Sequence, residues 1–230
     1  MRALALAGLH LARGNDARVR RFLAARLRGL PPAEDDALRK RWVIALGAVA
    51  DAYRGRGEPD QAIVVYRKAL ELLPGAPRVH LNLGLAYADA GRFADAVREY
   101  RQSLDTDAAQ PLAHVNWGIA LEALGDTAGA LARFRRALAI DPREPLAYFN
   151  LGTVMLVRGR AAEAVPLYRE AVAIDPSLAP AHFNLARAEV LLGDLRAAAA
   201  ALRRGLEFDP GNQGARAALD GVERELSRGR

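Results

Sequence analysis

Residues 77–110 read PRVHLNLGLAYADAGRFADAVREYRQSLDTDAAQ, and residues 145–178 read PLAYFNLGTVMLVRGRAAEAVPLYREAVAIDPSL. Both stretches are 34 residues long, with Gly at positions 8 and 15, Ala at position 20 and Tyr at position 24. The position-15 glycine recurs at this period through the chain, as Gly57, Gly91, Gly125, Gly159 and Gly193. Glycine suits a tight turn that needs a positive φ, and Pro74, Pro142, Pro176 and Pro210 close four of the units. Each unit is therefore predicted to be a helix, a turn and a second helix.

This pattern resembles the tetratricopeptide repeat (TPR) family, whose signature combines a 34-residue period with Leu-Gly, aromatic, Ala and Pro positions. In the unit that starts at Pro77, the residues Gly84, Tyr87, Gly91, Ala96 and Tyr100 occupy signature positions. The resemblance implies an all-α fold, a right-handed α-solenoid of helix-turn-helix repeats. Five repeats are predicted within residues 34–212, at 43–76, 77–110, 111–144, 145–178 and 179–212.

The two ends of the chain depart from the regular repeat. Residues 1–33 fit a divergent, basic sixth unit with Gly14 at the turn, and this fit favours a repeat segment over a signal peptide for the apolar start. About nine extra residues separate this unit from the next, and Glu34, Asp35 and Asp36 suit a helix N-terminus. We therefore expect the 43–76 repeat to begin with an extended helix. Residues 213–230 are amphipathic and predict a C-terminal capping helix.

Composition favours a folded, water-soluble chain, with 51% apolar and 26% charged residues and no apolar run near the ~18 residues of a membrane span. A cytoplasmic location is the default expectation. The net charge of +6 comes from residues 1–42, which hold ten basic and four acidic side chains. Five arginines of this segment raise the alternative of docking to a polyanion, a nucleic acid or an acidic membrane surface. They are Arg18, Arg20, Arg21, Arg26 and Arg28.

No motif in the sequence indicates catalysis or a cofactor. Cysteine is absent, and neither a zinc-protease, a nucleophile-elbow nor a phosphate-loop motif occurs. His80, His114 and His182 share position 4 of their repeats, but packed helices ~8–10 Å apart cannot bring three such side chains to the ~2 Å that zinc requires. We expect structural histidines, no metal, no cofactor and no enzyme activity.

The surface of each first helix carries the clearest sign of function. Positions 2, 5, 6, 9 and 13 lie opposite the side that packs on the second helix, yet they are not uniformly charged. Position 6 is Asn in four successive repeats, and position 5 is apolar. The predicted site comprises Asn82, Asn116, Asn150 and Asn184 with Leu81, Val115, Phe149 and Phe183. A carboxamide offers both a donor and an acceptor to an extended peptide.

The asparagine column (Asn82, Asn116, Asn150 and Asn184) resembles that of the O-linked N-acetylglucosamine transferase repeat domain. That resemblance implies a concave groove in which the amides hold a peptide backbone and the apolar neighbours select side chains. The alternative is that each Asn bridges adjacent first helices.

We therefore predict a protein-interaction scaffold or adaptor that binds a protein or an extended peptide, without a small-molecule substrate. Chaperone-tail binding is disfavoured because position 6 is not basic. A targeting or regulatory segment of a larger enzyme, such as a glycosyltransferase, is the second interpretation. Nucleic-acid and membrane partners are disfavoured, and self-association through the apolar groove stays open.

Overall fold

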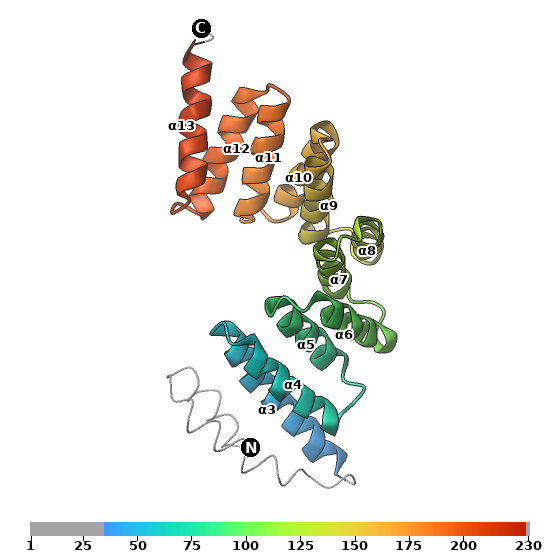
Figure 1. Ribbon diagram of the computed structural model, residues 1–230. Coiled ribbons are helices and arrows are strands. Elements are labelled where there is room, and N and C mark those ends of the chain that lie inside the picture. Colours follow the sequence, from blue (N-terminus) through green and yellow to red (C-terminus); the bar gives the residue numbers. More distant parts are fainter. Residues whose placement is uncertain (1–34, 229–230) are drawn as a thin grey trace. The chain divides into compact units, whose positions relative to one another are not determined.

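The computed structural model describes residues 35–228 of the chain. The divergent unit predicted at residues 1–33, with its basic cluster, lies outside the described residues. Within residues 35–228 the chain forms α-helices and no strand (Figure 1). These helices follow one another as helix-turn-helix pairs, which confirms the predicted fold class.

The helices belong to two compact units, divided between Gly125 and Asp126. The described part of the first unit contains α3 (Asp36–Gly55), α4 (Pro59–Leu72), α5 (Pro77–Asp89), α6 (Phe93–Thr106) and α7 (Pro111–Ala123). The second contains α8 (Thr127–Ile140), α9 (Pro145–Val157), α10 (Ala161–Ile174), α11 (Ala179–Leu191), α12 (Leu195–Phe208) and α13 (Gln213–Arg228). The division falls inside the predicted repeat 111–144, and the assignment of residues 34–212 to five repeats stays a prediction.

Local signals in the sequence explain where the helices start and stop. Proline occupies the first turn of α4, α5, α7 and α9, where its missing N–H costs no hydrogen bond. Asp126 and Asp194 cap α8 and α12 by accepting a hydrogen bond from a backbone N–H three residues later. The five position-15 glycines all have φ between 72° and 82°, the left-handed conformation that a turn between paired helices requires.

The core of each unit is built from columns of equivalent residues. The position-20 alanines, Ala62, Ala96, Ala130, Ala164 and Ala198, are all fully buried. The position-24 rings of Tyr66, Tyr100, Phe134 and Tyr168, all on second helices, are also buried. Gly84 lies directly against the Tyr100 ring, so a side chain at Gly84 would collide with it. Small and large residues thus interlock where paired helices cross.

The first and last described helices differ from those between them. Helix α3 has 20 residues, whereas α5, α7, α9 and α11 have 13 each. Its extra N-terminal turns begin at Asp36 and are capped by the Asp35 carboxylate, which accepts from the Leu38 N–H at 2.8 Å. Helix α13 packs on α12 and buries only Ala215 and Val222, so most of its surface faces solvent.

Candidate peptide-binding face

Each unit has a first-helix face of its own, formed by positions 2, 5, 6, 9 and 13 of the 34-residue repeat, on α3, α5 and α7 in the first unit and on α9 and α11 in the second. Ten large apolar side chains are exposed among the described residues, and five of them lie on these faces. Three lie in the first unit (Ile44, Leu112 and Ile119) and two in the second (Val157 and Leu191). The face makes up five of 34 repeat positions, so exposed apolar side chains concentrate there. Such clustering is typical of an interaction surface.

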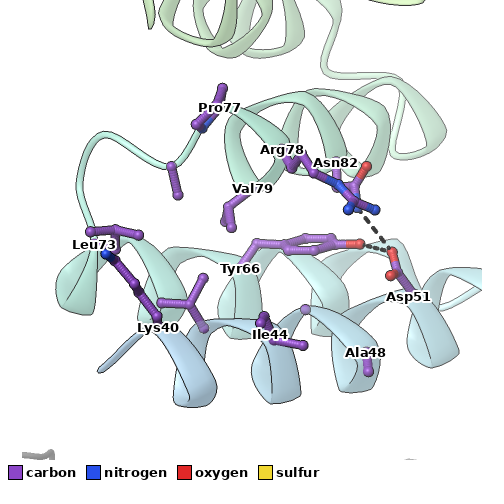
Figure 2. Close-up of a pocket in the computed structure, with 13 residues that line it drawn as sticks. Lys40, Ile44, Ala48, Asp51, Tyr66, Leu73, Pro77, Arg78, Val79 and Asn82 are labelled. Carbon is purple, nitrogen blue, oxygen red and sulfur yellow. Dashed lines mark hydrogen bonds between the residues drawn. The ribbon is translucent and has the colours of Figure 1, made fainter. Parts of the chain in front are cut away.

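In the first unit this face contains a cavity of about 570 Å³ between α3 and α5 (Figure 2). The Tyr66 ring projects from α4 between the two helices, with Ile44 and Ala48 on the α3 side and Val79 on the α5 side. Gly47 and Ala48 occupy positions 5 and 6 of this repeat. The equivalent residues in the later repeats are the predicted apolar residues and asparagines, which are larger. The cavity exists because α3 presents small residues where other first helices present large ones.

A hydrogen-bonded group closes one end of this cavity. The Asp51 carboxylate accepts from the Tyr66 hydroxyl and, at 3.4 Å, from the Asn82 amide (Figure 2). Burial, followed by this hydrogen bond and the negative charge of Asp51, raises the pKa of Tyr66 far above its ordinary value. Tyr66 therefore remains a donor, and Asn82 links α5 to α3.

The second unit repeats this arrangement with a neutral acceptor. The Thr153 hydroxyl accepts from Tyr168 at 3.2 Å and from the Asn184 amide at 3.5 Å, while it donates to the Phe149 carbonyl at 2.9 Å. A hydroxyl has one donor and two acceptor sites, so all three are used. Asn184 on α11 is thereby linked to α9, just as Asn82 is linked to α3.

The asparagine column is therefore not uniform, although all four side chains are half-buried. Asn82 and Asn184 bridge adjacent first helices, as the alternative interpretation expected. The Asn150 amide donates to the Leu146 carbonyl of its own helix at 2.7 Å, and its oxygen is not engaged by any described residue. Asn116 makes no side-chain hydrogen bond within residues 35–228.

Within each unit, the residue at position 9 of the preceding repeat explains this difference. Before Asn82 and Asn184 that residue is polar, Asp51 or Thr153, and it accepts the amide. Before Asn116 it is Leu85, which cannot accept a hydrogen bond. Asn150 lies on the first of the first helices in the second unit, and its amide donates within α9 instead. Two amides of the column thus retain hydrogen-bonding capacity for a ligand.

The four predicted apolar neighbours are packed more deeply than expected. Val115 is 0% exposed, so its side chain is not accessible to a ligand in this conformation, contrary to its predicted role as a contact residue. Leu81 packs on the core of the first unit, and the Phe149 ring lies 6.0 Å from that of Tyr168. Phe183 packs against Gly205 of α12. All three are half-buried.

The exposed apolar residues of the first-helix face occupy positions 2, 9 and 13, which the predicted site left out. Ile44 is 72% exposed and Val157 is 79% exposed, so these side chains are far more accessible than the position-5 residues. The signal was present in the sequence, since positions 2, 9 and 13 belong to the same predicted face as position 5. The relative depth of these positions could not be read from it.

The histidines hold the loops that connect consecutive helix pairs. A ring nitrogen of His80 lies 2.7 Å from the Pro74 carbonyl, and one of His182 lies 2.9 Å from the Pro176 carbonyl, so each side chain ties down the loop before its helix. The other nitrogen of His80 lies 2.7 Å from the Glu99 carboxylate. Burial opposes protonation, but the bonds to Glu99 and Pro74 outweigh it and raise the pKa of His80. Within residues 35–228 no three His, Asp or Glu side chains form a group that could hold a metal.

The paired helices, the glycine turns and the buried alanine and aromatic columns define a helical repeat protein. Family comparison makes this more specific, since four models of the tetratricopeptide repeat match residues 50–91, 81–106, 115–179 and 155–220. The chain belongs to the TPR family. A search of curated proteins finds no match to the sequence. In the described part of the chain, no helix has the length and apolar character needed to cross a membrane.

Several solved structures share the fold. A structure of MamA is 26% identical, with 70% of this chain and 95% of that chain aligned and a TM-score of 0.59. PilF of Pseudomonas aeruginosa is 21% identical over 83% of this chain and 92% of its own, with a TM-score of 0.70. YrrB, described as a TPR protein with an unusual peptide-binding site, is 21% identical over 82% of this chain and 100% of its own, with a TM-score of 0.56.

Proposed function

We propose that this protein is a non-catalytic interaction module that binds extended protein segments on the first-helix face of each unit. The observation that carries the proposal is the concentration of exposed apolar side chains on that face. Helix surfaces that only face water are usually charged. Covering the exposed apolar area at Ile44, Val157 and Leu191 with a partner would instead lower the free energy of the system.

The amides add a means of recognising a peptide backbone. Asn116 and Asn150 keep hydrogen-bonding groups that no described residue uses, and each carboxamide matches one backbone N–H and one C=O. Apolar contacts would supply affinity and the amides would fix the path of the peptide. The fold is compatible with such a role, since YrrB has a peptide-binding site on the same type of scaffold.

The experiment that tests this function is selection of a displayed library of short random peptides on the immobilised full chain. Fluorescence anisotropy then measures the affinity of each enriched peptide for wild type and for a fourfold variant. The variant carries Ile44→Ser, Ile119→Ser, Val157→Ser and Leu191→Ser. Because these side chains are exposed, the substitutions should leave the fold intact, which circular dichroism checks.

Val64→Ser provides the matched control. Val64 is 58% exposed, but it lies on the second helix α4 instead of the first-helix face. We expect the fourfold variant to bind about tenfold more weakly or worse, and Val64→Ser to bind as wild type does. If the fourfold variant and wild type bind the peptides with equal affinity, the first-helix face is not the binding site.

A further inference from the structure

The cavity between α3 and α5 sets one end of the first-helix face apart from the rest. We propose that this cavity receives one bulky apolar side chain of the bound peptide, and that an acidic residue next to this side chain contacts Lys40 and Arg78. This inference rests on the proposed function. The partner is thus a peptide segment in which a large apolar residue stands beside Asp or Glu.

The lining of the cavity favours an apolar group. Ile44 and Val79 face each other across it, and Leu73 and Ala76 line it as well (Figure 2). At one end of the cavity the Asp51 carboxylate already accepts from Tyr66 and Asn82, while Lys40 lies at the opposite end, beside Leu73 (Figure 2). A volume of about 570 Å³ lies within the range of sites that bind small organic groups, so a Leu- or aromatic-sized side chain fits.

The charges that line the cavity favour an acidic neighbour. Lys40 and Arg78 are exposed, and neither forms a salt bridge within residues 35–228. Arg39, adjacent in sequence to Lys40, pairs with Asp36 at 3.7 Å, so the acidic residue of α3 that is nearest to Lys40 in sequence is already engaged. The one acidic side chain that lines the cavity, Asp51, is held by its own hydrogen bonds. Two cations near an apolar cavity complement a peptide carboxylate.

Gly47 offers a way to fill the cavity without disturbing the fold. A Cβ built at Gly47 meets no atom within 4 Å, and the residue lies in the interior of α3, where glycine is an unfavourable helix former. Gly47→Phe places at position 5 the residue that α9 and α11 carry there, and Gly47→Leu does the same with the residue of α5. Gly221→Phe is the matched control, because a Cβ at Gly221 of α13 also meets nothing within 4 Å.

The test is a parallel selection from a displayed random peptide library on the full chain and on its folded variants. Peptides selected on wild type should share a Leu, Phe or Trp with an Asp or Glu within two positions. Their affinity should fall about tenfold or more in Gly47→Phe and Gly47→Leu, and should not change in Gly221→Phe.

Charge reversal tests the acidic part of the motif. In the double variant Lys40→Glu and Arg78→Glu, selection should favour Lys or Arg beside the apolar residue. The control variant, Arg67→Glu with Arg101→Glu, has the same change in net charge on exposed second-helix positions and should keep the acidic motif.

The outcomes separate this inference from the proposed function. If peptides depend on Val157 and Leu191 but bind the Gly47 variants unchanged, the first-helix face binds peptides and the cavity proposal is overturned. If no enriched peptide depends on the first-helix face, both fall. If analytical ultracentrifugation shows that Gly47→Phe dissociates a dimer, the occupant is a second copy of the chain and the proposal is overturned. If Gly47→Phe abolishes the binding of a small molecule but of no peptide, the occupant is a small molecule and the proposal is also overturned.

Discussion

The substitution Gly84→Ala should destabilise the protein, whereas Gly47→Ala should stabilise it. A Cβ at Gly84 would lie 2.5 Å from Cε1 and 2.7 Å from Cδ1 of Tyr100, about 1 Å inside ordinary carbon–carbon contact. The Tyr100 side chain is 0% exposed, so it cannot turn toward solvent without losing its packing. Such overpacking costs about 1–3 kcal/mol, while replacing a mid-helix glycine by alanine gains about 0.5–1 kcal/mol. The net effect of Gly84→Ala is a loss of about 0–2.5 kcal/mol.

Gly47→Ala receives the same helix-propensity gain without the collision, because a Cβ there meets nothing within 4 Å. The propensity contribution cancels between the two variants, so their free energies of unfolding should differ by about 1–3 kcal/mol from the contact with Tyr100 alone. Urea unfolding followed by far-ultraviolet circular dichroism measures this difference. Equal stability of the two variants would refute the close packing of the aromatic column on the first helices.

Three further predictions concern pH, the turns and the amides. The pKa of His80 is raised because its bonds to Glu99 and to a loop carbonyl outweigh the effect of burial. Protonated His80 therefore stabilises the fold, and this stabilisation is complete below the unfolded pKa of about 6.5. It is lost as the pH rises through the higher folded pKa. Urea unfolding from about pH 6 to pH 8 should show falling stability, and Glu99→Gln should flatten that fall. Gly159 has a φ of +73°, so Gly159→Ala should lower the free energy of unfolding by about 1–2 kcal/mol, whereas Gly75→Ala, at a glycine without positive φ, should not lower it. In peptide titrations, Asn150→Ala should weaken binding only several-fold, because a net hydrogen bond contributes about 0.5–1.5 kcal/mol, and replacing the whole asparagine column by Ala should abolish it.

The repeat period made most of the fold predictable. Glycines with a positive φ, prolines in first turns and small residues at helix crossings are local signals, and each recurs at a fixed spacing. The long first helix could also be expected, because acidic residues stand before an apolar-periodic run. These features depend on residues near one another in sequence, so they can be predicted without knowledge of tertiary contacts.

The detailed site was less predictable because it depends on contacts between repeats. Within each unit, the hydrogen bonds of an asparagine depend on position 9 of the preceding repeat and on the tyrosine that shares its acceptor, as at Asp51 and Thr153. The full burial of Val115 likewise could not be read from its repeat position, since position 5 is only half-buried at Leu81, Phe149 and Phe183. The cavity arises from two small residues on α3, whose effect appears only when α5 and Tyr66 are placed beside them.

The most direct test of peptide binding by the first-helix face is nuclear magnetic resonance of the side-chain amides. A nitrogen-15-labelled full chain is titrated with a library-selected peptide, with the amide signals assigned by single Asn→Gln variants. We expect the Nδ2 signals of Asn116 and Asn150 to shift on binding, because these amides have hydrogen-bonding groups that no described residue uses. Saturable binding that leaves both signals unchanged and shifts residues of the second helices instead would contradict the proposed site.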